Sequence, residues 1–315
     1  MAEFISLYSG SSGNSSVVRC GQRYLIVDMG KGVRTTSAAL KALGLAASDC
    51  DGILVTHEHS DHVKGLSTFL KKNTLPVYGA AETLDFLDSN GIVPASCELH
   101  ELEGREEDVG AFGVQSFPTS HDVPCVGYRI HTPDGKTMTI ATDLGMLTPP
   151  VHEALSGCDL VALESNYDLH MLRSGPYPYY LRARIESTRG HLSNDECSAK
   201  LLELIQEGCE KVCAVPSFAG EQHACACPAD RVQHAGRGGR CAGEGLHRAG
   251  TAPQRNESGI RVLNKTNGNA FALPFVLFSC FLCADVIACK KAGDKGRKAA
   301  GNFFRYTAFP AEHRQ

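Results

Sequence analysis

Short apolar runs alternate with amphipathic stretches along the first two thirds of the chain. The runs are bounded by Gly, Ser, Asp or Pro, as strands of a sheet are. Strands are predicted at 4–8, 15–20, 24–30, 52–56, 76–80, 112–120, 159–165 and 211–215, with a hairpin at 126–143. Helical spacing of apolar residues predicts helices at 35–45, 62–72, 81–91 and 193–208. This order predicts an α/β fold (α+β in some schemes), a sandwich of two sheets with helices on both outer faces.

The regular pattern stops after Val215. Residues 217–259 are dominated by Gly, Ala, Arg and His and show neither a helical nor a strand period. The apolar block 271–289 is nearly long enough to span a bilayer, but a proline and an aspartate inside it argue against a membrane span. We therefore expect an incomplete sandwich domain over 1–215 and a largely disordered tail over 216–315.

Composition narrows the function classes only slightly. A hydrophobic fraction of 43% suffices for a core, and a formal charge of −4 gives no global electrostatic case for nucleic acid. Any phosphate-binding surface would therefore be local. The first ten residues lack a basic segment followed by a long apolar run, so no signal peptide is expected and a cytoplasmic protein is the default. Nothing in the sequence indicates an obligate protein partner.

The segment THEHSDH (residues 56–62) concentrates ligand-type side chains at the end of a predicted strand. Alternate residues share a side of an extended or turning backbone, so His57 and His59 are placed to hold one ion. Asp61 and His62 point elsewhere and are placed to hold a second. Imidazole and carboxylate ligands without thiolate suit Zn²⁺ or Mn²⁺. The alternative is a polar loop with clustered histidines, but four ligand-type residues at this spacing favour two divalent metal ions.

Here the chain resembles the metallo-β-lactamase superfamily, whose αββα sandwich matches the predicted architecture. The resemblance implies further ligands from later loops. His121 in PTSHDVPCVGY would complete the site of His57 and His59, and Asp143 in IATDLGM would bridge both ions. Such a bridging carboxylate lets two cations share and acidify one water.

Within that superfamily the chain more specifically resembles the WalJ/YycJ-type exonuclease branch, whose members are related to tRNase Z and RNase J. The resemblance is carried by GSSGNSS, THEHSDHVKGL, TDLG, ESNYDLHML, GPYPYYLRARIES and GHLSN, and covers residues 1–215. In tRNase Z, a glutamate after a strand and a histidine in an H-[S/L]-[T/S] motif assist phosphodiester cleavage. The matching residues are Glu164 and His191, so His191 is expected to act as an acid or phosphate clamp that Glu164 orients. Asp61 is expected to position or deprotonate the attacking water.

The segment 173–189 interleaves arginine with tyrosine and is a candidate surface for nucleic acid. Arginine holds phosphates and tyrosine stacks on splayed bases, so substrate contacts are expected from Tyr179, Tyr180, Arg182 and Arg184. The alternative is a solvated helix with its tyrosines in the core. The predicted function is a two-metal phosphodiesterase, a DNA exonuclease. Two alternatives stay open, a thioester or lactam hydrolase on the same fold and an inactive, frameshifted relative.

The resemblance implies one more histidine after the strand at 211–215, in an AHLSRENN-like motif. The chain has PSFAGEQHACACPADRVQH there instead. With suitable synonymous codons, reading these residues from the second base of the Pro216 codon gives HLSRENNTPALALQTVYN. One extra base after the Val215 codon would therefore explain the change, and we interpret 216–315 as an out-of-frame tail. The competing interpretation is a new metal module built from Cys225, Cys227, His223 and His234.

Overall fold

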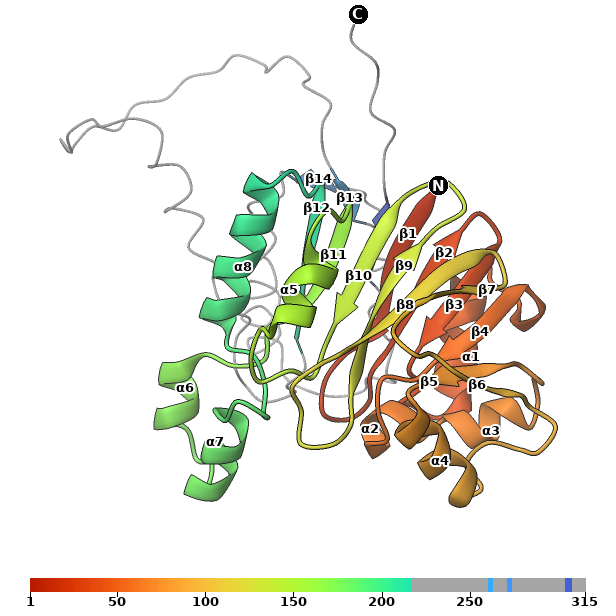
Figure 1. Ribbon diagram of the computed structural model, residues 1–315, viewed down its shortest axis with the longest axis horizontal. Helices are drawn as coiled ribbons and strands as arrows, with labels where there is room; N and C mark the ends of the chain where they lie inside the picture. The colour runs from red at the N-terminus through yellow and green to blue at the C-terminus, as the bar shows by residue number, and fades with distance from the viewer. Residues whose placement is uncertain (217–259, 263–270, 274–303, 308–315) are drawn as a thin grey trace, which may run out of the picture.

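The computed structural model describes residues 1–216, 260–262, 271–273 and 304–307. Two sheets pack face to face and carry helices on both outer faces (Figure 1). The predicted αββα sandwich is therefore confirmed.

The first sheet comes from the N-terminal third of the chain. Six of its seven strands, in spatial order, are β1 (Ala2–Tyr8), β2 (Ser15–Cys20), β3 (Arg23–Val27), β4 (Cys50–Leu54), β5 (Val77–Gly79) and β6 (Leu99–Glu101). The pairs among β1, β2 and β3 are antiparallel, whereas β3 to β6 run parallel. The helical elements of this half are α1 (Val33–Ala42), the 3-10 turn η1 (Ala47–Asp49), α2 (Ser60–Val63), α3 (Leu66–Leu70) and α4 (Ala81–Ser89).

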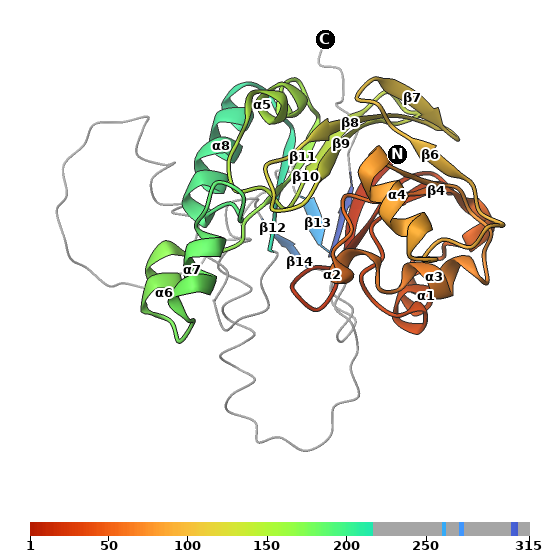
Figure 2. The same ribbon diagram turned by 60° about the horizontal axis from the view of Figure 1, so that its bottom comes forward.

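The second sheet is formed by the residues that follow. The strands at one of its edges, which α8 covers, are parallel. In spatial order its strands are β12 (Lys211–Val215), β11 (Leu160–Glu164), β10 (Thr137–Ala141), β9 (Val126–His131), β8 (Phe112–Pro118) and β7 (Glu106–Val109). Its helices are α5 (Pro149–Leu155), α6 (Leu169–Ser174), α7 (Tyr179–Ile185) and α8 (Asn194–Gln206). Helices α5 and α8 pack on the outer face, while α6 and α7 stand beside the lower end of the sandwich (Figures 1 and 2).

Alternation along the strands builds separate apolar layers. In β1, Phe4 faces the second sheet, whereas the next residue, Ile5, faces the helices of the first half. Val17 and Val18 of β2 divide in the same way. Successive side chains of a strand point to opposite faces, so a strand covered on both sides is apolar at nearly every position. This double burial explains why the strand runs are easy to find in the sequence.

Two predicted helices show how local chemistry sets helix ends. The stretch predicted as one helix at 62–72 is two short helices, α2 and α3, because the chain at Gly65 packs against another loop. The Gly65 N–H donates to the Met29 carbonyl at 2.8 Å instead of to the preceding helical turn, which interrupts the helix. A Cβ on Gly65 would lie 1.8 Å from the carbonyl oxygen of Lys31, so only glycine allows this close approach. Helix α8 begins as predicted, with a capping box in which Ser193 and Glu196 bond each other's backbone N–H groups.

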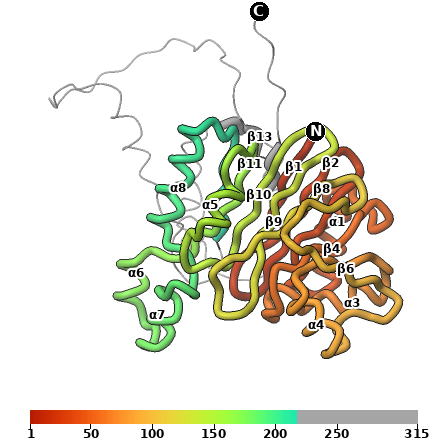
Figure 3. Tube along the Cα trace, viewed as in Figure 1, coloured from red at the N-terminus to blue at the C-terminus, as the bar shows by residue number. Residues whose placement is uncertain are grey.

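Three short strands come after Val215, so 211–215 is not the last strand of the described chain. They are β13 (Ile260–Val262), β14 (Phe271–Leu273) and β15 (Phe304–Thr307). Strand β15 pairs antiparallel with β1, whose outer backbone groups would otherwise face no partner strand. On its other side β1 pairs with β2, and Figure 3 traces these two strands next to each other. The rest of the tail predicted to be disordered, and the cysteines and histidines of the competing metal module, lie outside the described residues. No helix in the described ranges is long and apolar enough to cross a membrane.

Candidate metal centre

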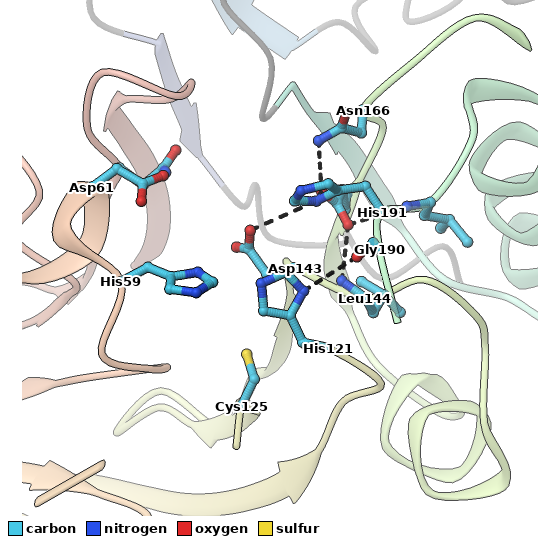
Figure 4. A network of polar contacts seen from close by, with 12 residues as sticks. His59, Asp61, His121, Cys125, Asp143, Leu144, Asn166, Gly190 and His191 are labelled. Carbon is cyan, nitrogen blue, oxygen red and sulfur yellow. Dashed lines mark hydrogen bonds and ion pairs between the residues drawn. The ribbon is translucent and has the colours of Figure 1, made fainter. Parts of the chain in front are cut away.

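The predicted ligands lie just past strands that end at one edge of the sandwich. Strands β3 and β4 run parallel in the first sheet. Strands β8, β10 and β11 share one direction in the second, because β8 and β10 are each antiparallel to β9 and β11 is parallel to β10. Loops after parallel strands meet at the same edge, which is where α/β proteins bind ligands. Figure 4 shows side chains of both sheets turned toward one another there.

One group of side chains, the triad half, consists of His57, His59 and His121. Nitrogen atoms of the three rings lie within 4.8 Å of one another, and His57 Nε2 lies 3.0 Å from His59 Nδ1. His57 and His121 are buried, whereas the His59 side chain is 30% exposed. Burial lowers the pKa of His57 well below its usual value, and the neighbouring histidines lower it further. A neutral ring in this position keeps a lone pair available for a cation.

Hydrogen bonds on the far sides of the rings determine which nitrogens face the centre of the triad half. Thr56 Oγ1 donates to Asp28, so it accepts from His57 Nδ1 at 3.0 Å and leaves Nε2 as the acceptor nitrogen. His121 Nδ1 donates to the Gly190 carbonyl at 3.2 Å, which leaves its Nε2 buried without a hydrogen-bond partner. His57 Nε2 and His121 Nε2 lie close to His59 with their far sides already bonded, which is how histidines present ligand atoms to a divalent cation. The triad half therefore fits a metal ion.

The second group, the carboxylate half, consists of Asp61, His62 and Asp143. His62 Nε2 lies 3.5 Å from Asp143 Oδ2 and 3.6 Å from Asp61 Oδ2. Asp143 is buried and its Oδ2 atom has no hydrogen-bond partner. Burial also raises the pKa of Asp143. Burial opposes the charged form of His62, but Asp143, Asp28 and Asp61 outweigh it and raise the pKa of His62 to about 9. This half attracts positive charge. Ligand atoms of His62 and Asp143 lie within 4.8 Å of one another and of His57, whereas Asp61 is not part of that group and approaches it only at His62.

Asp28 links the two halves and was not singled out in the sequence. Its carboxylate accepts hydrogen bonds from the Thr56 backbone and hydroxyl and from His62 Nδ1, each at 2.8 Å. It thereby orients His62 directly and His57 through Thr56, as outer carboxylates orient metal-binding histidines. Asp28 and Asp143 are the two non-glycine residues of the described chain with positive φ, at 60° and 56°. The sequence offered one indication of this role: Asp28 is a charged residue directly after the apolar run 24–27.

His191 and Glu164 form a buried pair beside Asp143. His191 Nδ1 lies 2.7 Å from Glu164 Oε1, and the other Glu164 oxygen accepts from the Leu144 backbone at 2.9 Å. Glu164 is fully buried, so it is not a surface carboxylate. Burial disfavours both charges, but the charge and hydrogen bond of Glu164 raise the pKa of His191 to about 9. The charge and hydrogen bond of His191 in turn lower the pKa of Glu164. Glu164 therefore holds a proton at His191 Nδ1 and favours the charged form of the ring.

The predicted substrate residues lie on α7 next to this centre. Tyr179 and Tyr180 are 79% and 74% exposed, which contradicts the alternative that these tyrosines belong to the core. Arg184 contacts Asp122 at 2.5 Å, and Asp122 is the next residue after His121, so α7 is tied to the triad half. Arg182 donates to the Arg173 carbonyl, also at 2.5 Å. Both arginines are thus partly engaged within the protein, while the two tyrosines are open to solvent.

The sandwich and the histidine–aspartate cluster at its strand ends define a metallo-hydrolase. Residues 23–209 match the family model described as a beta-lactamase superfamily domain. Exodeoxyribonuclease YycJ of Bacillus anthracis is 34% identical over 206 residues, covering 65% of this chain and 78% of that protein. Exodeoxyribonuclease WalJ of Streptococcus pneumoniae is 30% identical over 210 residues, with the same coverage.

The solved structure of the metallo-beta-lactamase fold protein YhfI from Bacillus subtilis is similar in fold. Its TM-score is 0.54 at 18% identity, covering 70% of this chain and 89% of that one. The chain belongs to the metallo-β-lactamase superfamily, in the WalJ/YycJ branch, and is a hydrolase.

Proposed function

We propose that this protein is a phosphodiesterase that cleaves DNA as an exonuclease, using divalent zinc or manganese ions. The observation that carries the proposal is the buried His191–Glu164 pair next to the converging ligands, 2.7 Å between Nδ1 and Oε1. A cleaved phosphodiester needs a proton at its leaving oxygen, and a histidine held protonated by a carboxylate supplies one. The exodeoxyribonuclease relatives support DNA as the substrate.

Each half of the centre has a separate role in this proposal. His57, His59 and His121 would hold the first ion, and Asp61, His62 and Asp143 would hold the second. Bound divalent ions would offset charge on the phosphoryl oxygens and acidify a water. Asp61, whose side chain is 31% exposed, orients the attacking water and accepts its proton. Glu164 holds the proton of His191 at Nδ1, so Nε2 is the atom that meets a phosphate or leaving oxygen.

The exposed tyrosines of α7 favour a nucleic acid over a small acyl substrate. Tyr179 and Tyr180 present open ring faces on the helix that Arg184 connects to the His121 loop. Aromatic faces near a phosphodiesterase centre stack on unpaired bases, whereas a thioester or lactam requires no such surface.

We also propose that residues 216–315 are read out of frame and that the chain loses a ligand of the second ion there. The support is that suitable synonymous codons for these residues, read one base out of register, give HLSRENNTPALALQTVYN, together with the loss of periodicity after Val215. Resequencing the gene around the Val215 codon tests this directly. An unchanged frame in independent clones of the same gene would make the tail genuine and leave the second ion to the three described side chains.

A competition among substrates tests the function. The frame-corrected protein, supplied with Zn²⁺ or Mn²⁺, is assayed side by side on duplex DNA, single-stranded DNA, nitrocefin and a glutathione thioester. The proposal expects DNA cleavage to exceed both other reactions. Preferential turnover of the thioester or of nitrocefin would contradict the nuclease assignment and support the acyl hydrolase.

A further inference from the structure

The GSSGN segment at residues 10–14 has no role in the function proposed so far, yet it ends inside the metal centre. The backbone N–H of Asn14 donates to the Asp61 carbonyl at 2.7 Å, and the Asn14 carbonyl accepts from Gly30 at 2.8 Å. Gly30 is needed for this approach, because a Cβ there would lie 1.6 Å from the Asp61 carbonyl oxygen. The segment is therefore held rigidly against the loop that carries Asp61 and His62.

The side chain of Asn14 points at the carboxylate half. Its Oδ1 accepts from the Gly10 backbone N–H at 2.8 Å, which fixes the orientation of the amide. Its Nδ2 therefore faces inward, 3.0 Å from His62 Nε2 and 3.1 Å from Asp61 Oδ2. His62 Nδ1 donates to Asp28, so Nε2 is the nitrogen that must bind a second ion. The amide N–H groups thus approach the same lone pairs that a cation at this position needs.

We propose that Asn14 controls the second metal position by competing with the cation for His62 Nε2 and Asp61 Oδ2. The inference rests on the proposed metal centre. A cation binds the second position only after the amide gives up both contacts, and the hydrogen bonds that hold Gly10, Gly30 and Asp61 to Asn14 resist that movement. In this chain the three described ligands of the carboxylate half do not displace the amide, so the protein holds one tight ion, in the triad half.

A proton also competes for His62 Nε2, since the surrounding carboxylates favour the charged ring. That competition is held constant by making every measurement at one pH. The amide is the competitor that substitution can remove.

The experiment measures metal stoichiometry and affinity in the full chain rather than activity. Wild type, Asn14→Ala and Asn14→Asp are titrated with Zn²⁺ and, separately, Mn²⁺, with binding measured by calorimetry and by elemental analysis after dialysis. We expect one tight equivalent in wild type. In Asn14→Ala the second equivalent should bind about ten-fold more tightly or better, because two hydrogen bonds of roughly 1 kcal/mol each no longer compete. In Asn14→Asp the gain should be larger, because a carboxylate replaces the amide donor.

Controls separate competition by the amide from added charge and from misfolding. Asn90→Asp adds the same charge on an exposed residue at the end of α4 and should bind metal as wild type does. Thermal melting identifies a variant that fails to fold, and the other Asn14 variant then decides. Two tight equivalents in wild type, or a gain in Asn14→Asp without one in Asn14→Ala, would overturn the inference. Absence of any tight ion in wild type would instead refute the proposed metal centre itself.

Discussion

The two halves of the candidate centre differ in how completely the described chain builds them. The triad half has three converging ring nitrogens, two of them with their tautomers set by Thr56 and Gly190. The carboxylate half has one histidine and two carboxylates, and an amide from Asn14 lies against its ligand atoms. The first half is complete before Val215, whereas the second, under the proposed frame correction, gains a further histidine beyond it.

Under the proposed function, this difference makes metal binding and catalysis separable in this chain. The three histidines of the triad half all precede Val215, so the chain would bind one ion whether or not its second half is complete. Metal content alone therefore does not show that the enzyme is active. Cleavage of a phosphodiester by two ions requires both halves, since the second ion offsets charge that the first does not reach. A substitution in one half should therefore change metal content and nuclease activity by different amounts.

The largest effect is expected from restoring the reading frame after Val215. Replacing the residues beyond Val215 with HLSRENNTPALALQTVYN and its continuation should raise DNA cleavage by at least ~100-fold, because even outer-sphere ligand changes cost 10–100-fold. The measurement is the initial rate on labelled DNA with Mn²⁺ or Zn²⁺ for both proteins at equal concentration. Equal rates in the two proteins would show that the extra histidine is dispensable and that the halves are equally complete.

Removal of a ligand from the triad half should abolish tight metal binding in the chain as it stands. His59→Ala leaves two ring nitrogens, and the affinity for Zn²⁺ should fall by more than ~100-fold. Elemental analysis after dialysis should then show about one equivalent fewer than in wild type. His152→Ala, an exposed histidine on α5, is the matched control and should keep its metal. Equal metal in wild type and His59→Ala would refute the assignment of the triad half.

The sequence was sufficient for the buried strands and for most of the centre. Strands covered on both faces are continuous apolar runs, and residues such as His57 and Asp143 stand out as polar groups at strand ends. Strand β7 was missed because its residues are charged and largely exposed, so no apolar period marks it. Helix α7 was left undecided because Tyr179 and Tyr180 are exposed, and exposed residues give no apolar spacing that distinguishes a helix from a loop.

Asp28 and Asn14 could not be assigned from sequence for a different reason. Their importance lies in contacts with His62, which is 34 and 48 positions away along the chain. A single aspartate or asparagine after a strand or in a Gly/Ser turn is ordinary turn chemistry. Only the packing of three loops shows that these side chains point into the centre.

A smaller effect is expected from Asp28→Asn, which alters the link between the halves. The amide would present N–H groups to Thr56 Oγ1 and His62 Nδ1, where the carboxylate now accepts hydrogen bonds from both. In the frame-corrected protein the affinity for the second ion should fall about 10–100-fold, as for other outer-sphere carboxylates. The first ion should be less affected, because Asp28 reaches His57 only through Thr56. Calorimetric titration resolves the two steps, and equal losses in both would show that the halves are not separable.

The smallest effect is expected from the exposed surface of α7, where neither metal nor fold depends on the side chain. Tyr179→Ala and Tyr180→Ala remove rings that are mostly in solvent, so the free energy of unfolding should stay within about 0.5 kcal/mol of wild type. Base stacking contributes about 1–3 kcal/mol per base, so affinity for single-stranded DNA should fall roughly five-fold or more in each variant. Metal content should not change. Ile205→Ala, an exposed apolar residue on α8, is the matched control and should bind DNA as wild type does. If the tyrosine variants bind DNA normally, α7 is not a substrate surface, and the preference for nucleic acid must then come from the metal centre alone.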